Sequence, residues 1–443
     1  MLSVLANPTY SRLFAAQVIA LMGTGLMTVA LGLLAYDIAG PQAGAVLGTA
    51  LAIKMIAYVG LAPVANAAVD ILPRKAVLIG ADLIRAAVAL CLPFIDAVWQ
   101  IYAMIFVLQA ASATFTPTFQ ALIPDILEDE QDYTKALSLS RLAYDIENLV
   151  SPTLAGLLLL VMTYSGLFVG TTAGFLGSAL LVVATSLPPR KAPPSRRSFL
   201  QRLTRGSRIY LATPRLRGLL SLNMSAAAAG AFVIVNTVVI VRSEYQGSET
   251  DVAYALAAFG AGSMLAALAL PRLLSTLTDR SVMMVARAGL AGVTLVLALS
   301  RGIGGLWPLP VFLAGWALIG LLYSAGQTPS GRLLRRSAHP EDRSALFAAQ
   351  FALSHACWLL TYPLAGWAGE AFGMAATMGM LGLLALAGVA AAAYFWPKSE
   401  EAELSHGHPD LPPDHPHLKA HGAAGHRHIV VIDDEHRAWP SQG

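Results

Sequence analysis

Residues 12–36 read RLFAAQVIALMGTGLMTVALGLLAY, and Arg12 at their start is their one charged residue. A helix that crosses the ~30 Å core of a bilayer needs about 20 consecutive apolar residues. The run is too long for a signal-peptide core, and no small-residue cleavage site follows it before the next polar stretch. We therefore expect it to be a first membrane-spanning helix that the mature protein retains.

The same pattern repeats along the whole chain. The sequence has 443 residues, of which 56% are apolar and 12% are charged, whereas a soluble domain has about 25% charged residues. This composition predicts an all-α membrane protein with twelve transmembrane helices. The twelve apolar runs lie near 12–36, 43–69, 76–95, 100–123, 136–161, 164–187, 217–241, 252–274, 281–300, 307–330, 345–368 and 373–396.

The basic residues between the runs predict the orientation. With the N-terminus inside, the cytoplasmic connections contain nineteen Lys and Arg residues, and the external connections contain two, Arg242 and Arg301. Because such an excess marks the cytoplasmic side, we expect both termini inside, in a bacterial inner membrane with lipid as the surrounding partner. The net charge of +3 gives no reason to expect a nucleic-acid partner, and we expect a monomer.

The chain divides into four parts. Residues 1–187 and 217–396 each contain six apolar runs, residues 188–216 form a basic cytoplasmic linker, and residues 397–443 form a polar, His-rich tail that we expect to be mostly disordered. The two large parts share features at a nearly constant offset: Asp70 and Asp279 follow the second and eighth runs, and Thr116-Pro117 and Thr328-Pro329 end the fourth and tenth. Such duplication is typical of transporters with a central site between two halves.

A loop motif leads to a family resemblance. Residues 66–75, NAAVDILPRK, lie between the second and third runs. At Asp70, Arg74 and Lys75 they resemble the signature of the major facilitator superfamily. The resemblance implies a fold of two six-helix halves, in which this loop clamps the cytoplasmic gate through charge pairing.

A second motif lies in the fifth run. Residues 147–156, ENLVSPTLAG, resemble the fifth-helix motif of proton-coupled exporters of the same superfamily at Pro152 and Gly156, while Glu147 departs from it. The chain as a whole resembles the exporter branch that includes siderophore effluxers. Residues 5–10 (LANPTY), residues 29–33 (VALGL) and the His-rich end are similar to bacterial nickel-resistance permeases.

The tail predicts a metal-binding segment. Its prolines prevent a helix, and neutral imidazole is a ligand that suits Ni²⁺, Co²⁺, Cu²⁺ and Zn²⁺. An inert solvated tail is the alternative interpretation. Eight of the ten histidines lie in the tail, and they are the candidate ligands: His406, His408, His415, His417, His421, His426, His428 and His436.

Charges inside the fifth run are candidates for ion coupling, because ionisable residues in membrane helices are costly and usually face a cavity or each other. At 100° per residue, Arg141, Asp145 and Asn148 share one face, and Glu147 lies about 100° away from it. Arg141 and Asp145 form either a structural ion pair or part of the transport site. In the second case Asp145 or Glu147 carries the coupling proton or meets a cation.

Other polar residues within the runs are weaker candidates. Asp82 and Arg85 indicate a structural network on the gate side, Lys54 is expected to neutralise a carboxylate, and His355 is either a proton carrier or a packed histidine. The family resemblance implies that the first and fourth helices line a central cavity. The candidate lining residues are Gln17, Thr24, Thr28, Gln109, Thr116 and Gln120.

These features predict a secondary transporter. No phosphate-binding loop and no nucleophile–base set is visible, so we expect a non-enzymatic protein without a required cofactor, driven by an ion gradient. The leading hypothesis is a proton-coupled exporter of nickel, with cobalt second, in which the metal is both substrate and tail ligand. The alternatives are an exporter of siderophores or drugs with an accessory metal-binding tail, and a membrane metal receptor.

Overall fold

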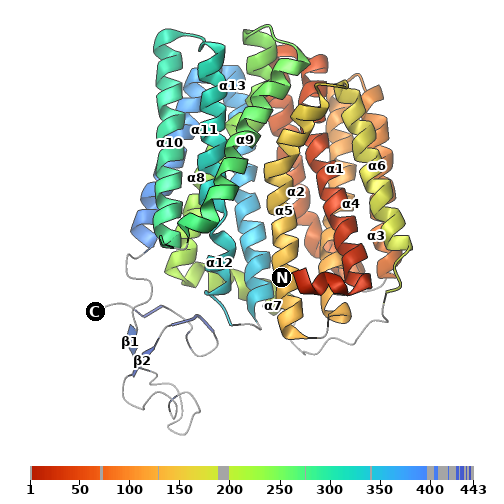
Figure 1. The fold of residues 1–443 in the computed structure, drawn as a ribbon, viewed down its shortest axis with the longest axis vertical. Helices are drawn as coiled ribbons and strands as arrows, with labels where there is room; N and C mark the ends of the chain where they lie inside the picture. The colour runs from red at the N-terminus through yellow and green to blue at the C-terminus, as the bar shows by residue number, and fades with distance from the viewer. Residues whose placement is uncertain are drawn as a thin grey trace.

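The structure, a computed structural model, is almost entirely helical (Figure 1). It describes residues 2–69, 73–127, 129–187, 199–274, 276–339 and 342–396. In the tail it describes residues 404–407, 418, 426–428, 430–433, 436 and 439–440.

The N-terminal bundle consists of six long helices. Asn7 caps the first of them, because its side-chain oxygen accepts hydrogen bonds from the N–H groups of Thr9 (3.0 Å) and Tyr10 (3.1 Å), and Pro8 occupies the first helical position. Short 3₁₀ turns precede or connect these helices at Leu2–Ala6, Gly40–Gln42 and Leu92–Phe94. The six helices are α1 (Pro8–Ala39), α2 (Ala43–Val69), α3 (Arg74–Cys91), α4 (Val98–Ile126), α5 (Glu130–Leu158) and α6 (Tyr164–Val183).

The C-terminal bundle repeats this plan with one difference at its end. Its last helix, α13, spans 53 residues and contains Gly373 at φ +80° and ψ 168°. That backbone region favours glycine, so the chain reverses there without a longer loop and α13 forms two spanning arms. The helices are α8 (Pro214–Val239, extended by a π-turn at Ile240–Glu244), α9 (Glu249–Leu273), α10 (Asp279–Gly304), α11 (Leu309–Gln327), α12 (Ser330–Arg335) and α13 (Arg343–Phe395).

Length and composition mark nine candidate membrane spans in the described part of the chain. Two of them are 51 residues long. Pro8–Tyr58 covers α1 and part of α2, and Ala345–Phe395 covers both arms of α13. The polar helix α5 falls outside this set but lies within the N-terminal bundle and completes the twelve. The predicted fold class, an all-α membrane protein of two six-helix halves, is confirmed.

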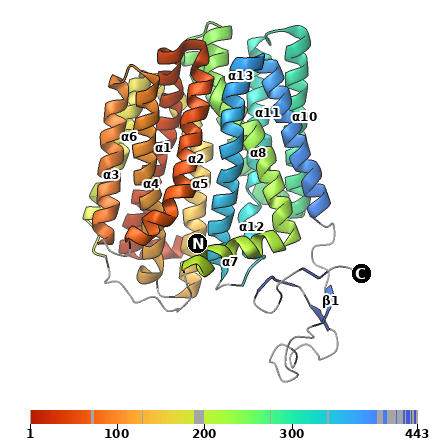
Figure 2. The same ribbon diagram turned by 180° about the vertical axis from the view of Figure 1, so that it is seen from behind.

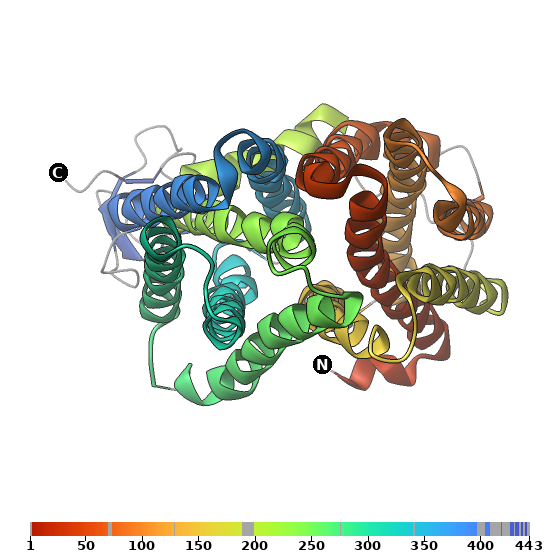
Figure 3. The same ribbon diagram turned by 90° about the horizontal axis from the view of Figure 1, so that it is seen from above.

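The two bundles stand side by side, with α1 to α6 in one and α8 to α13 in the other (Figure 3). They meet where α2 packs against α13 and α5 packs against α9. The linker contains a helix, α7 (Phe199–Ala212), which lies across the end of the molecule (Figure 2). It is held to α13, because the hydroxyl of Tyr210 donates to Gln350 Oε1 (2.5 Å), and Arg205 pairs with Asp342 just before α13 begins.

The described polar contacts between the halves concentrate at one end, which the predicted orientation makes the outer end. There the hydroxyl of Ser243 donates to the hydroxyl of Tyr36 (3.0 Å), and Gln42 Nε2 donates to Glu370 Oε1 (3.0 Å). The helices also approach closely, since a Cβ at Gly48 would lie 2.6 Å from the carbonyl oxygen of Tyr362. The outer end is therefore closed in this conformation.

Part of the tail packs against the other end of the C-terminal bundle (Figure 1). Ile432 is buried with Trp396 in one apolar cluster, and His339 Nε2 lies 3.3 Å from Asp433 Oδ2. Strands β1 (Leu404–His406) and β2 (His426–His428) pair antiparallel, with His406 opposite His426. For these described residues the tail has defined structure, which the sequence did not lead us to expect.

Replacing Gly48 by Val should disfavour closure of the outer end, because the added methyl groups would meet the backbone of α13. Overpacking of this kind costs about 1–3 kcal/mol. In a chain whose two cysteines are replaced by serine, a new cysteine at Ser243 should react faster with a membrane-impermeant maleimide when Gly48→Val is present.

Gly80→Val is the matched control, because a Cβ at Gly80 would have no heavy atom within 4 Å. Equal labelling rates in the two backgrounds, at equal protein abundance, would contradict the closing role of this contact.

Candidate functional site

A cavity of about 160 Å³ lies between the two bundles. Its walls come from α1 to α5 on one side and from α8, α9, α11 and α13 on the other. Its described lining contains four ionisable groups that are not tyrosines: Lys54, Arg85, Glu147 and His355. The rest is rich in aromatic rings, contributed by Tyr58, Phe115, Phe259, Tyr323, Phe351, Trp358 and Tyr362.

Lys54 of α2 and Glu147 of α5 form the charged pair of the N-terminal wall. Each is the electrostatic partner of the other, and the Nζ of Lys54 lies 5.9 Å from the ring centroid of Tyr58. Gly25 of α1 makes room for this part of α5, because a side chain at that position would collide with Ser151. Glu147 is the described acid whose charge acts on Lys54, and both groups line the cavity, so neutralisation of Lys54 by Glu147 stays a prediction.

Asp82 and Arg85 of α3 form a second buried pair. They are ion-paired, and the hydroxyl of Ser178 also donates to Asp82 Oδ2 (2.7 Å). The guanidinium of Arg85 lies between two rings, 4.4 Å from the centroid of Phe115 and 4.6 Å from that of Phe175. This is the structural network that the sequence predicted, with the addition that Arg85 also reaches the cavity lining.

For the predicted polar face of the fifth helix, the structure describes the backbone but not the side chains. Arg141, Asp145 and Asn148 lie on α5, but their side chains are outside the described part of the structure, so the interpretation of Arg141–Asp145 as an ion pair stays a prediction. Glu147 is the described acid of this helix that lines the cavity.

His355 of α13 is packed among aromatic rings. Its ring centroid lies 3.9 Å from that of Phe351 and 5.5 Å from that of Tyr58, and its Nδ1 lies 2.7 Å from the carbonyl oxygen of Phe351. It lines the cavity and joins the two halves through Tyr58. His355 is therefore a packed histidine that also lines the cavity, and its role as a proton carrier stays a prediction.

The six predicted lining residues divide into three groups. Gln17 and Thr24 line the cavity, and the side chains of Thr116 and Gln120 lie outside the described part. Thr28 and Gln109 are not in the lining. The hydroxyl of Thr28 donates to Thr24 in its own helix (3.1 Å), and α4 instead faces the cavity with Ser112 and Phe115, which leaves Gln109 buried inside the bundle.

The loop motif at the inner end is partly described. Asp70 lies outside the described residues. Arg74 pairs with Asp125 of α4, and Lys75 Nζ donates to the carbonyl oxygens of Val183 (2.8 Å) and Thr185 (2.9 Å) at the end of α6. The described contacts of Arg74 and Lys75 thus join α3 to α4 and α6.

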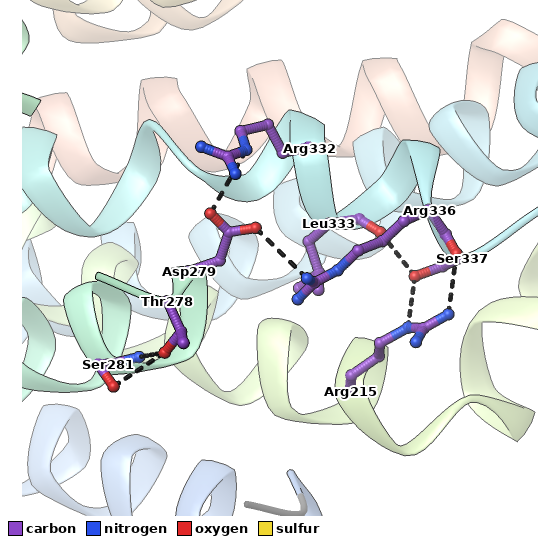
Figure 4. Close-up of polar contacts among 8 residues, drawn as sticks. All are labelled: Arg215, Thr278, Asp279, Ser281, Arg332, Leu333, Arg336 and Ser337. Carbon is purple, nitrogen blue, oxygen red and sulfur yellow. Dashed lines mark hydrogen bonds and ion pairs between the residues drawn. The ribbon is translucent and has the colours of Figure 1, made fainter. Parts of the chain in front are cut away.

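The C-terminal bundle has a corresponding cluster (Figure 4). Asp279 lies 3.6 Å from Arg332 Nε and 3.7 Å from Arg336 Nη1. Arg215 at the start of α8 donates to Ser337 Oγ (2.8 Å) and to the carbonyl oxygen of Arg336 (2.9 Å). An acid at the start of α10 therefore lies close to basic residues in α12 and directly after it.

The metal prediction has limited support from the described residues. They contain no group of three or more His, Cys, Asp or Glu side chains arranged to hold a metal ion. Of the tail histidines, His406, His426 and His428 lie on the two strands and His436 Nδ1 lies 3.0 Å from Asp433 Oδ1. His408, His415, His417 and His421 lie outside the described residues.

Apart from His355, sequence reasoning missed the C-terminal wall of the cavity. Asn223 of α8 and Tyr323 and Gln327 of α11 line it, and Arg287 of α10 is buried behind Tyr323 and Gln327. Arg287 is a charge inside the apolar run 281–300, which is the signal that would have revealed it. The aromatic residues carry no such signal, because they are equally common in lipid-facing positions.

Comparison with known proteins identifies the family. The sequence matches the family model of the Major Facilitator Superfamily over residues 13–303 and 219–432. The chain belongs to this superfamily. It is therefore a non-enzymatic secondary transporter and a multi-pass membrane protein.

Its relatives include efflux pumps for organic compounds. It is 25% identical over 378 residues to the multidrug efflux pump Tap of Mycolicibacterium fortuitum, which covers 81% of this chain and 90% of that protein. It is 26% identical over 184 residues to macrolide efflux protein A of Streptococcus pyogenes, which covers 40% of this chain and 45% of that protein. These relatives are drug and macrolide pumps rather than nickel permeases, so the nickel interpretation depends on the tail.

Solved structures show the same fold. The nucleoside transporter NupG superposes with a TM-score of 0.65 at 14% identity, covering 88% of this chain and all of NupG. A POT family transporter in complex with 5-aminolevulinic acid gives a TM-score of 0.63 at 10% identity, covering 88% of this chain and 96% of that one. At such low identity these matches establish the fold alone.

Replacing Asp82 by Asn should destabilise the protein strongly, because it leaves the buried Arg85 guanidinium without a counter-charge. Breaking a buried pair in this way costs about 3–5 kcal/mol. The measurement is the free energy of unfolding of purified protein in mixed micelles.

Asp132→Asn is the control, since its pair with Lys135 is partly exposed and should contribute no more than about 1 kcal/mol. Similar losses for the two variants would show that Asp82 does not hold the bundle.

Proposed function

We propose that the protein exports amphipathic organic cations from the cytoplasm in exchange for protons. The observation that carries this proposal is the cavity between the two bundles, in which one described carboxylate, that of Glu147, stands among aromatic rings. Aromatic faces attract organic cations, and a largely apolar lining with few polar groups is typical of small-molecule sites.

The lining suits an organic molecule better than a bare metal ion. Ni²⁺ and Co²⁺ require several nitrogen, oxygen or sulfur ligands around one point. Among the described lining residues, Glu147 and His355 are the only acid and histidine, and His355 is packed between Phe351 and Tyr58. The proposal therefore follows the organic-exporter alternative of the sequence analysis.

The Lys54–Glu147 pair supports a simple coupling mechanism. In the proposed cycle, without substrate, the Lys54 ammonium acts as the counter-charge of the Glu147 carboxylate, since both groups line the cavity. A cationic substrate and a proton would each replace Lys54 at this carboxylate, and both could not do so together. Because the two compete for one group, each cycle would carry a substrate in one direction and a proton in the other, while rocking of the halves exposes the cavity to either side.

The relatives support the same choice. The names of Tap and macrolide efflux protein A describe pumps for drugs and macrolides. Macrolides carry an amino sugar, so they combine a cationic amine with a large apolar body, which agrees with a carboxylate surrounded by aromatic rings. Erythromycin and tetraphenylphosphonium are accordingly the first probes to use.

Purified protein in proteoliposomes should accumulate these cations against their gradient when protons flow in the opposite direction. Glu147→Gln should abolish this proton-driven accumulation, because the neutral amide cannot exchange a proton. Lys54→Met should shift the pH dependence of transport, because Glu147 then lacks its internal counter-charge.

Asp96→Asn is the control, since Asp96 is an exposed acid in a loop at the outer end. Unchanged accumulation by Glu147→Gln would refute the coupling role, and absence of transport of both probes by the wild type would refute the organic-cation proposal.

We propose in addition that the tail binds divalent transition metal. The pairing of β1 with β2 supports this, because it brings the backbones of His406 and His426 opposite each other, and cross-strand neighbours have Cβ atoms about 4.5–5.5 Å apart. The tail would act as an accessory to the transporter rather than as the transport site, since it follows the last spanning helix.

The full chain should therefore bind Ni²⁺ in titration calorimetry, and a chain ending at Pro397 should not, while erythromycin transport remains unchanged. Binding should weaken below the imidazole pKa because protons compete for the ligand nitrogen. After nickel loading, cells expressing either chain should retain as much nickel as empty cells. Equal nickel depletion by both chains would instead show that the membrane part exports nickel.

A further inference from the structure

Arg287 of α10 is a buried cation with neutral partners. Its side chain is 1% exposed, its Nη1 donates to the carbonyl oxygen of Tyr323 (3.0 Å), and its Nη2 donates to Gln327 Oε1 (2.8 Å). Among the described residues no carboxylate pairs with it. A guanidinium that is not neutralised in a membrane bundle indicates a functional position.

The contact with Arg287 fixes the orientation of Gln327. Arginine can only donate hydrogen bonds, so the Gln327 amide must turn its oxygen toward Arg287. Its NH₂ group is then directed away from Arg287. Because Gln327 lines the cavity and its nitrogen donates to no described residue, this wall offers N–H donors to whatever occupies the cavity.

Asn223 of α8 provides a second amide on the same wall. Its side chain lines the cavity and is 4% exposed. Its Nδ2 is buried and has no hydrogen-bond partner among the described residues. A buried donor without a partner requires an explanation, and a ligand acceptor in the adjacent cavity supplies one.

We propose that Asn223 and Gln327 form a hydrogen-bond donor subsite that binds a carbonyl or carboxylate oxygen of the transported molecule. Arg287 is a positioning residue: it holds the Gln327 amide and makes its N–H groups stronger donors. This inference rests on the proposed function and extends it. The substrate is then two-ended, with its amine at Glu147 on one bundle and its oxygen acceptor at the amides on the other.

In this arrangement both bundles contribute to recognition of the substrate. A molecule that contacts both walls favours the conformation in which the walls are close, and one that lacks the acceptor meets the C-terminal wall only through its aromatic rings. The subsite therefore distinguishes erythromycin, which has lactone and ketone oxygens, from tetraphenylphosphonium, which has no oxygen.

Gln327→Glu is the sharpest test, because it is isosteric and would pair with Arg287, so folding is retained while the NH₂ donor is lost. The KM for erythromycin should rise about tenfold, the effect of one hydrogen bond of ~1.4 kcal/mol, with kcat nearly constant. Asn223→Ala should act in the same way, and transport of tetraphenylphosphonium should change less than twofold in both variants.

Ser354→Ala is the matched control, since Ser354 lines the same wall but its hydroxyl donates to Phe351 of its own helix (3.0 Å). For Arg287, the KM for erythromycin should rise in Arg287→Met and should be partly restored in Arg287→Lys, which keeps a charged donor. These KM changes separate a positioning role from a loss of fold, which would lower abundance and affect both probes.

Three outcomes overturn the subsite. One is an unchanged KM for erythromycin in Gln327→Glu and Asn223→Ala. The second is an equal loss for both probes. The third is a wild type that transports tetraphenylphosphonium but not erythromycin, which leaves the organic-cation proposal intact. A wild type that transports neither probe overturns the proposed function, and the subsite with it.

Discussion

The cost of an uncompensated charge in an apolar bundle organises the interior of this protein. Three of the described cations in spanning helices, Lys54, Arg85 and Arg287, lie at or next to the cavity, and the surroundings of each compensate its charge in a different way. Arg85 is neutralised by Asp82 and enclosed by two rings, Lys54 shares the cavity with Glu147, and Arg287 has neutral oxygens. The first arrangement is a closed ion pair, whereas under the proposed mechanism a substrate changes the surroundings of the other two.

Most of the fold was predictable because lipid imposes a simple rule on the chain. Every spanning helix must present apolar side chains over its length, so the runs and their number can be read from composition. The orientation inferred from the basic residues stays a prediction. Helix α5 shows the limit of that rule, because its polar composition removes it from the candidate spans. The sequence analysis found it as the apolar run 136–161, which contains the motif at Pro152 and Gly156.

The candidate site was predictable mainly where charge marks it, although the uncharged Gln17 and Thr24 were also found. Lys54, Arg85, Glu147 and His355 were found from the sequence because ionisable residues are rare in membrane helices, and all four line the cavity. The amides and aromatic rings of the other wall were not found, because asparagine, glutamine and tyrosine also serve in helix packing and at lipid interfaces. The periodic pattern that nominated Gln109 and Thr28 identified polar faces correctly, but polar faces in this bundle also bond to their own helix.

The polar character of α5 has a consequence for how the chain is made. Helix α5 contains six charged residues among 29. Such a helix inserts poorly into lipid by itself, because each charge near the middle of the bilayer opposes insertion. Synthesis from the N-terminus reduces this difficulty. Lys54 of α2 and the small residues of α1 are made before α5, so α5 can pack against them. We therefore expect insertion of this transporter to be cooperative, with α5 settling in the membrane by packing against helices made before it, such as α1.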